Sequence, residues 1–249
     1  MTRISNMILL AGALVVSATE LAAQSGSWPT VHQQALWLTT NVEHRVTPNT
    51  SLWFDGSWRR IGGAGTEPQQ VLLRPGILHT IAPGVRIGAG YTYVATAPYG
   101  EVPQPTPTRE HRAWQHLTIA HTAGAVAITH RYRWEQRWLA PVTGSGLGQY
   151  SYQQRARYMV RAQVPLGGIT YRSRAITGFV QEELLLPVGH GGSAGRFAQN
   201  RFAIGVGLPI GARQRLDIGY MNLWNAITSV PANEVNHVVT LGWVVTSGR

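Results

Sequence analysis

The sequence predicts an all-β fold: an antiparallel up-and-down transmembrane β-barrel of about 12 strands, with 10 strands as the alternative. Three observations indicate this fold. Apolar residues alternate with polar or small ones, short and long connections follow one another in turn, and the chain begins like a secretory signal peptide. Alternating segments separated by turn residues are typical of bacterial outer-membrane barrels.

The first segment has the order of a signal peptide. Arg3 supplies a positive charge, the apolar run of residues 7–16 follows, and a stretch of small residues ends at Ala23. We expect cleavage after Ala23, so that residues 1–23 are the signal peptide and residues 24–249 form one barrel domain. The apolar run is too short for a membrane-spanning helix, which needs about 20 apolar residues.

The period of two is clearest in two segments. From Val85 to Thr96 the odd positions are apolar or aromatic, and the even positions are mostly small or polar. From Val126 to Arg137 one face carries apolar and aromatic residues, and the other face carries the charged residues. A helix would scatter these charges around its circumference, so the pattern predicts strands with one polar face.

Reading the chain in this way predicts eleven segments, most of them long enough to cross a bilayer at a tilt, for which about 9 to 11 residues suffice. They are residues 34–44, 50–59, 70–79, 85–96, 110–121, 126–138, 152–163, 169–185, 200–208, 214–223 and 235–245. Bacterial barrels of one chain carry an even number of strands. We therefore expect either a further strand within residues 24–33 or one misassigned segment.

The connections between these segments alternate in length. Short ones are predicted at residues 81–84, 122–125, 165–168 and 209–213, and long ones at residues 60–69, 97–109, 139–151, 186–199 and 224–234. Outer-membrane barrels have short periplasmic turns and long extracellular loops, so this layout favours a barrel with its short turns in the periplasm.

Aromatic residues are placed as the girdles of a membrane barrel would require, in or beside the predicted strands. The tryptophans among them are Trp37, Trp53, Trp58, Trp114, Trp134, Trp138, Trp224 and Trp243. Tyr91, Tyr93, Tyr132 and Tyr220 accompany them.

The composition limits the function classes. The chain has no cysteine, which excludes disulfides and thiolate metal sites. Its 21 cationic residues are all arginine, and the formal net charge is +10. Arginine binds phosphate and carboxylate groups bidentately, which suits contact with lipopolysaccharide or a charged barrel lumen. A GC-rich genome that replaces lysine with arginine is the other explanation. Because the chain is exported, we expect no nucleic-acid partner.

Several short motifs resemble the bacterial domain-of-unknown-function family number 2490, over nearly the whole mature chain. They are Leu73-Arg74-Pro75-Gly76, Gly88-Ala89-Gly90-Tyr91, Glu110-His111-Arg112-Ala113-Trp114-Gln115, Arg131-Tyr132-Arg133-Trp134-Glu135-Gln136-Arg137, Gln199-Asn200-Arg201, Asp217-Ile218-Gly219-Tyr220 and Asn236-His237. The resemblance implies an outer-membrane-type β-barrel. Because this family has no assigned chemistry, the resemblance implies no catalytic residues.

The polar face is the candidate site, as a ladder of charged side chains in the lumen. With a turn near residues 123–124, Arg131 is expected opposite His116, and Glu135 opposite Arg112, where opposite charges attract. Arg161, Arg201, Arg215 and Asp217 extend the same pattern. The predicted ligand-binding residues are Glu110, Arg112, His116, Arg131, Arg133, Glu135, Arg137, Arg155, Arg157, Arg172 and Arg174.

Catalytic and metal-binding groups are not predicted. His111 and His121 share a strand face that His116 does not share, so we expect no histidine metal site and no cofactor. Gly191-Gly192-Ser193, which follows His190, lies in a predicted loop and is interpreted as flexible surface.

Three function classes stay open. The first is an outer-membrane barrel with an arginine-rich polar lumen and a structural or ligand-binding role. The second is a small anion-preferring channel. The third is an outer-membrane enzyme that modifies lipid or lipopolysaccharide. The expected partners are outer-membrane lipid and lipopolysaccharide, the barrel-assembly machinery and a small acidic solute.

Overall fold

The computed structural model describes residues 29–99, 104–189, 199–227 and 232–248, so the predicted signal peptide, residues 1–23, lies outside the described residues. The described elements are twelve strands and one short 3-10 helix, η1 (Gly63–Gly65). The strands are β1 (Thr30–Arg45), β2 (Thr50–Ile61), β3 (Glu67–Ala82), β4 (Val85–Thr96), β5 (Thr108–Ala123), β6 (Val126–Thr143), β7 (Gly146–Leu147), β8 (Ser151–Tyr171), β9 (Arg174–Val188), β10 (Gln199–Gly211), β11 (Gln214–Ile227) and β12 (Ala232–Gly248).

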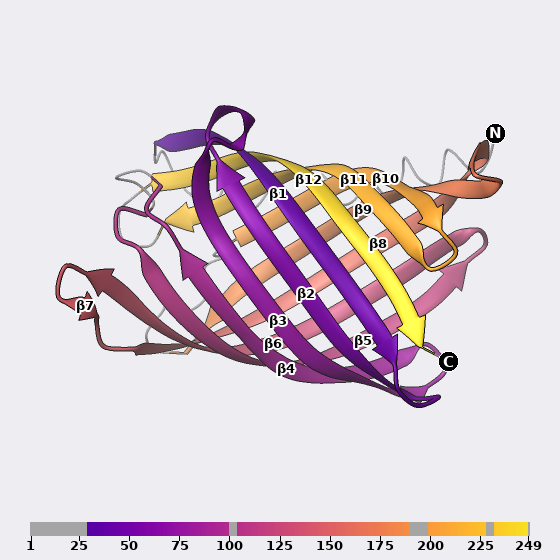
Figure 1. Ribbon diagram of the computed structural model, residues 1–249, viewed down its shortest axis with the longest axis horizontal. Helices are drawn as coiled ribbons and strands as arrows, with labels where there is room; N and C mark the ends of the chain where they lie inside the picture. Colours follow the sequence, from indigo (N-terminus) through magenta and orange to yellow (C-terminus); the bar gives the residue numbers. More distant parts are fainter. Residues whose placement is uncertain (1–28, 100–103, 190–198, 228–231, 249) are drawn as a thin grey trace.

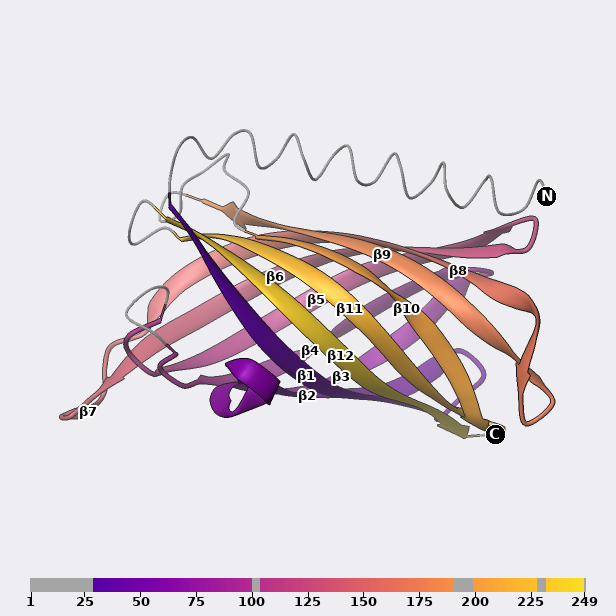
Figure 2. The same ribbon diagram turned by 90° about the horizontal axis from the view of Figure 1, so that it is seen from above.

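The strands form a closed barrel, which confirms the predicted all-β barrel fold of about twelve strands. Neighbours follow the order β5-β4-β3-β2-β1-β12-β11-β10-β9-β8-β6, and the pairing of β5 with β6 closes the ring. The two-residue strand β7 pairs only with the end of β6. Of the twelve described strands, eleven therefore form the wall, in which they run obliquely to the long axis (Figures 1 and 2).

The barrel closes with an odd number of wall strands because one pair of neighbours is parallel. β1 pairs with β12 in parallel along its full length, from Thr30 opposite Asn233 to Arg45 opposite Gly248, while the other neighbours are antiparallel. The barrel is therefore mixed rather than purely antiparallel. The eleven segments predicted from alternation correspond to the eleven wall strands. Within the described residues, closing the barrel therefore requires neither a twelfth wall strand nor the removal of a predicted one.

Short and long connections lie at opposite ends of the barrel. One end carries the turns of two to four residues that follow β1, β3, β5, β8 and β10, together with the end of β12. The other end carries β7, η1 and the longer connections, and Figure 1 shows β7 and the end of β12 at opposite ends. The predicted alternation of connection lengths is thus confirmed, with one misplaced turn.

The misplaced turn is the one predicted at residues 165–168. β8 continues through Pro165 and the glycines after it, with a shift of register between Pro165 and Thr170. The turn lies instead at Arg172 and Ser173, whose φ angles of 51° and 59° are positive. A two-residue hairpin turn with two successive positive φ angles matches the right-handed twist of the strands it joins. Glycine and asparagine are the usual residues in such a turn. The strand predicted at residues 169–185 therefore begins at Arg174.

The two faces of the wall differ as the alternation predicts. Large apolar residues on the outward face are exposed, among them Leu52, Ile77, Ile87, Ile204 and Val239. The aromatic residues divide between the two faces. Trp58, Trp134, Trp138 and Trp243 are exposed, whereas Trp37, Trp53 and Trp114 are buried in the barrel interior, so these last three do not belong to an outer girdle.

The barrel interior is closely packed in its middle. Trp114 is 0% exposed and lies edge-on to Trp53, and Leu78 completes the same apolar cluster. Gly76 and Gly90 on β3 and β4 make room for the Trp114 ring, because a Cβ atom on Gly76 would lie 2.5 Å from it. A second cluster joins Trp37 to apolar residues of β2, β10, β11 and β12.

No helix in the described ranges is both long enough and apolar enough to cross a membrane.

Candidate functional site

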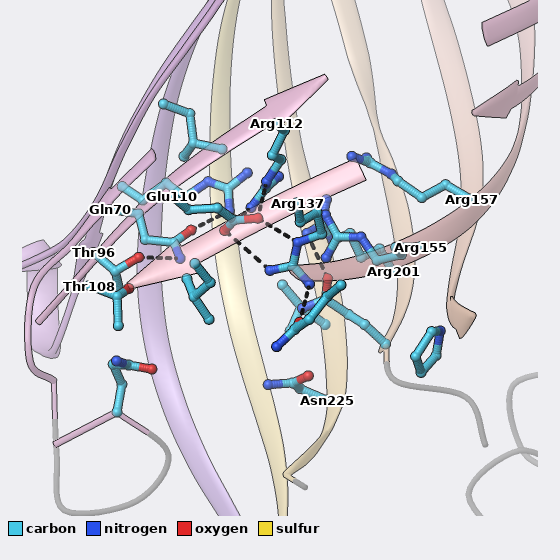
Figure 3. A pocket seen from close by; sticks show the side chains of 18 of the residues that line it. Gln70, Thr96, Thr108, Glu110, Arg112, Arg137, Arg155, Arg157, Arg201 and Asn225 are labelled. Carbon is cyan, nitrogen blue, oxygen red and sulfur yellow. Dashed lines mark hydrogen bonds and ion pairs between the residues drawn. The ribbon is translucent and has the colours of Figure 1, made fainter. Parts of the chain in front are cut away.

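Three buried carboxylates organise the arginines of the barrel interior. The first is Glu110 on β5, which accepts hydrogen bonds from Arg112 Nε and Nη2 at 2.6 and 2.8 Å. Arg137 on β6 donates to the same carboxylate through Nε, and through Nη2 at 3.1 Å. Bidentate contacts of this kind are strong and fix the guanidinium plane. Glu110 therefore holds two arginines from adjacent strands side by side, as Figure 3 shows.

The second carboxylate, Glu135 on β6, links the next arginines. Its Oε2 accepts from Arg155 Nε and Nη2 at 3.0 and 2.5 Å, and its Oε1 accepts from Arg157 Nη1 at 2.7 Å. Arg112 approaches it to 4.0 Å and so connects it to Glu110. The cross-strand register explains these partners, because Arg155 is paired with Glu135 in the sheet.

The third carboxylate, Glu183 on β9, was not among the predicted site residues. It is 3% exposed and accepts from Arg157 Nη2 at 2.7 Å, Arg131 Nη2 at 3.0 Å and Arg201 Nη1 at 3.2 Å. Arg157 therefore bridges Glu135 and Glu183. The three carboxylates and their arginines form one continuous network across β5, β6, β8, β9 and β10.

The predicted cross-strand pairs are shifted by two residues. The turn between β5 and β6 consists of Gly124 and Ala125, so His116 lies opposite Arg133, and Arg112 opposite Arg137. A shift of two keeps every side chain on its predicted face. The polar face is therefore placed as expected, although its partners differ.

The predicted site residues divide into three groups. Glu110, Arg112, Arg137, Arg155 and Arg157 line one large cavity. Four others, His116, Arg131, Arg133 and Glu135, do not line that cavity but lie beside it, within the same network or in contact with it. Arg172 and Arg174 are exposed at the β8–β9 hairpin, where they donate to the Ile210 and Gly211 carbonyls, and they do not join the others.

Further ion pairs place more charges in the interior. Asp55 pairs with Arg74, Glu43 with Arg86, and Asp217 with both Arg161 and Arg215. In the described residues the inward face then carries twelve arginines, at positions 59, 74, 86, 112, 131, 133, 137, 155, 157, 161, 201 and 215. It carries seven carboxylates, at positions 43, 55, 110, 135, 183, 217 and 234. Arginine thus exceeds carboxylate by five.

Two of these arginines have no carboxylate partner among the described residues. Arg133 stacks on Trp114 with its Cζ 4.6 Å from the ring centroid and contacts His116 Nδ1 through Nη2 at 3.2 Å. Arg59 stacks on Trp37 at 3.6 Å. Stacking on tryptophan favours a desolvated cation without neutralising its charge.

The cavity has a volume of about 940 Å³ and lies toward the long-loop end of the barrel. Seven arginines line it, at positions 59, 74, 112, 137, 155, 157 and 201 (Figure 3 labels five of them). The described carboxylates that line it are Glu110 and Glu234. A cavity with this balance of charge attracts anions.

The cavity does not extend through the barrel in the described residues. Its lining reaches Leu72 and Arg74 on β3, whereas Trp53, Leu78 and Trp114 lie outside the lining and are buried. These buried side chains lie on the short-turn side of the cavity. The arrangement is that of a pocket open at the long-loop end.

A loop residue contributes to the mouth of this cavity. Tyr99, between β4 and β5, packs against the apolar cluster around Trp37 and lines the cavity together with Gln104. Burial, and then the nearby Glu234 carboxylate, raise the pKa of the Tyr99 phenol above its ordinary value. Tyr99 therefore stays a neutral hydrogen-bonding group beside Glu234.

Sequence reasoning missed Arg59, Asp55, Glu183 and Glu234 as interior residues. A signal for two of them was present, because alternation over residues 50–59 puts Asp55 and Arg59 on the same face as Trp53. Glu183 was obscured by the misplaced turn, and Glu234 by a strand that begins earlier than predicted, at Ala232.

Histidines of the outward face contact tyrosine hydroxyls of neighbouring strands. His111 contacts the Tyr91 and Tyr150 hydroxyls, His130 contacts the Tyr158 hydroxyl at 2.9 Å, and His237 contacts the Tyr220 hydroxyl at 2.6 Å. In the described ranges no group of three or more histidine, aspartate or glutamate residues is arranged to hold a metal ion. Gly191-Gly192-Ser193 and His190 lie outside the described residues.

Comparison with known proteins gives a family but no chemistry. The chain is 24% identical over 247 residues to an uncharacterized protein from Methylorubrum extorquens, with 98% of this chain and 99% of that protein covered. The family model described as protein of unknown function, DUF2490, matches residues 34–233, which include every wall strand at least in part. The chain therefore belongs to the DUF2490 family, as its motifs predicted.

Proposed function

We propose that this protein is an outer-membrane β-barrel whose cavity binds a small acidic solute from the long-loop side. The observation that carries the proposal is the cavity of about 940 Å³ lined by seven arginines and, among described residues, two carboxylates. Arginine supplies planar, permanently charged donors that fit phosphate and carboxylate groups.

The outward face supports the proposed location. It is rich in exposed apolar and aromatic side chains, such as Leu73, Ile77 and Trp138. Contact of these side chains with lipid is more favourable than contact with water. The expected signal peptide in residues 1–23 accounts for export. With the short turns in the periplasm, the cavity opens to the exterior. Lipid and lipopolysaccharide then surround the wall, and the barrel-assembly machinery inserts it.

The closed middle of the barrel favours binding over conduction. A channel for anions requires a continuous polar path, whereas Trp53, Leu78 and Trp114 occupy the interior between the cavity and the short turns. The network around Glu135 and Glu183 also fixes the arginines beside the cavity in place. Preorganised donors of this kind suit a binding site.

The location is tested by gel mobility. We expect the protein extracted from the outer-membrane fraction to migrate differently before and after boiling, because a closed barrel stays folded in mild detergent. The same protein unfolded in concentrated urea before loading is the control, and its mobility should not change on boiling. Recovery of the intact chain in the soluble periplasmic fraction, with no change of mobility, would contradict the proposed location.

The cavity is tested by binding and by conductance. We expect the refolded barrel to bind inorganic phosphate or an alkyl phosphate in calorimetry, and not glycerol. Arg155→Gln should weaken this binding roughly tenfold, since one charge-assisted hydrogen bond is worth about 1.5 kcal/mol or more. Arg172→Gln, a change at the exposed hairpin, is the matched control and should have no effect.

The same preparation should give no stable conductance in planar bilayers, because the middle of the barrel is filled. A conducting, anion-selective protein would replace the binding proposal with the channel alternative. Absence of phosphate binding by the folded barrel would contradict the proposed function altogether.

A further inference from the structure

Arg59 has an unusual position in the cavity. Its side chain is 7% exposed, donates from Nε to Ser57 at 3.2 Å and from Nη1 to Gln70 at 2.9 Å, and stacks on the Trp37 ring. Its Nη2 has no hydrogen-bond partner among the described residues. A buried cation without a counter-charge is unfavourable, so an anion from outside the chain would complete this site.

A second arginine faces the same aromatic ring. Arg201 on β10 lies 5.3 Å from the Trp37 centroid, against 3.6 Å for Arg59, so one ring carries two guanidinium groups. Arg201 is held by Glu183 at 3.2 Å and by Gln199 at 2.7 Å, while its buried Nε has no partner. Both arginines line the cavity. Two adjacent cations that repel each other are a favourable place for a dianion.

Near the mouth of the cavity, buried acceptor oxygens lack hydrogen-bond donors. Glu234 on β12 is 1% exposed and forms no ion pair among the described residues. Its Oε2 accepts from Asn225 Nδ2 at 3.1 Å, but its Oε1 has no partner, and neither has Asn236 Oδ1. These residues line the same cavity as Arg59. A carboxylate with an open acceptor position in a buried place is complemented best by an ammonium group.

We propose that the cavity binds a small zwitterion, with a phosphate-class oxyanion between Arg59 and Arg201 and an ammonium group at Glu234. This inference rests on the proposed function and adds to it the chemical class of the solute. The register brings the two ends of the site close together, because Arg201 is paired with Leu223 on β11 and Leu223 with Asn236 on β12. Asn236 is two residues along the strand from Glu234, a separation that a short ligand with two charged ends can span.

The test uses two ligand series and the refolded mature chain in detergent. Aminoalkyl phosphates with two to six carbons between nitrogen and oxygen carry both charges, and alkyl phosphates of equal length carry only the oxyanion. We expect one chain length of the first series to bind best, because the two ends of the site are fixed. It should bind about tenfold more tightly than its alkyl counterpart, the effect of one additional charge-assisted contact.

Variants separate the two ends of the site. Arg59→Gln should weaken both series about tenfold, whereas Glu234→Gln should weaken only the aminoalkyl phosphates and so remove the difference between the series. Arg133→Gln is the matched control. Arg133 is also an interior arginine without a carboxylate partner among the described residues, but it does not line the cavity. Each variant must first show the heat-dependent mobility of a folded barrel.

The outcomes distinguish this inference from the proposed function. If the wild-type barrel binds neither series, the proposed function fails and the inference fails with it. If the wild type binds both series equally, or if Arg59→Gln binds as the wild type does, the zwitterion site is overturned while an anion-binding cavity remains. Should Arg59→Gln fail to fold, Arg201→Gln and the length dependence of the wild type decide the question.

Discussion

Replacement of Glu183 by glutamine is expected to lower the free energy of unfolding by about 3–5 kcal/mol, the cost of leaving buried charges without their partner. Glu183 accepts from Arg131, Arg157 and Arg201, and each of these side chains would keep its charge in a closely packed interior. The glutamine has nearly the same shape, so the effect reports the lost charge and not a cavity. Urea titration of the refolded barrel in micelles measures it.

Glu67→Gln is the control for this experiment, because Glu67 is an exposed residue at the beginning of β3. Its replacement should change stability by less than about 0.5 kcal/mol, as surface substitutions usually do. A Glu183→Gln variant as stable as the wild type would show that water reaches the three arginines freely, and that the network does not hold the cavity wall in place.

Substitution of Gly90 by alanine is expected to destabilise the barrel by about 1–3 kcal/mol through overpacking. A Cβ atom at this position would overlap both the Trp114 ring and the Pro75 carbonyl oxygen. The backbone oxygen belongs to the neighbouring strand and cannot move without disturbing the sheet. The mobility shift on heating, followed against temperature, measures the loss.

Gly144→Ala is the matched control, since a Cβ atom there would meet nothing within 4 Å. It should melt with the wild type. If Gly90→Ala also melted with the wild type, the Trp114 ring would not occupy the space between β3 and β4. The middle of the barrel would then be less filled than the binding proposal requires.

The wall strands were predictable because each has two chemically different faces. β4 was predicted with its exact bounds, from Val85 to Thr96, since its outward residues are apolar and its inward residues are small or polar. Along the whole height of a barrel wall, the inward and outward faces have different surroundings. The polarity of the side chains therefore alternates from one residue to the next.

The hairpin at Arg172 and Ser173 was not predictable by the same reasoning. Pro165 and the glycines at positions 167 and 168 are residues typical of turns. In the structure they lie within β8, where the register with β9 shifts between Pro165 and Thr170. The real turn uses residues that rarely adopt positive φ, so composition gives no sign of it. This misplaced turn is also why Arg172 and Arg174 were expected in the interior.

The candidate site was predictable only as a face, and not as a set of contacts. Alternation placed Arg112, Arg133 and Glu135 on the inward side, yet it does not say which residues of the neighbouring strands they contact. Glu183 and Arg131 are 52 residues apart in the chain and meet because β6 and β9 both pair with β8. Such contacts depend on strand order and register, which a local pattern does not contain.

The parallel seam between β1 and β12 also restricts how this wall is built and rebuilt. Adding or removing a β-hairpin changes the strand number by two, so repeated gain or loss of hairpins would preserve the odd count and the seam with it. A circular permutant of the wall would need a linker as long as the barrel is tall, because Thr30 and Gly248 lie at opposite rims. Conversely, tags fused at the two ends of the wall would lie at opposite ends of the barrel.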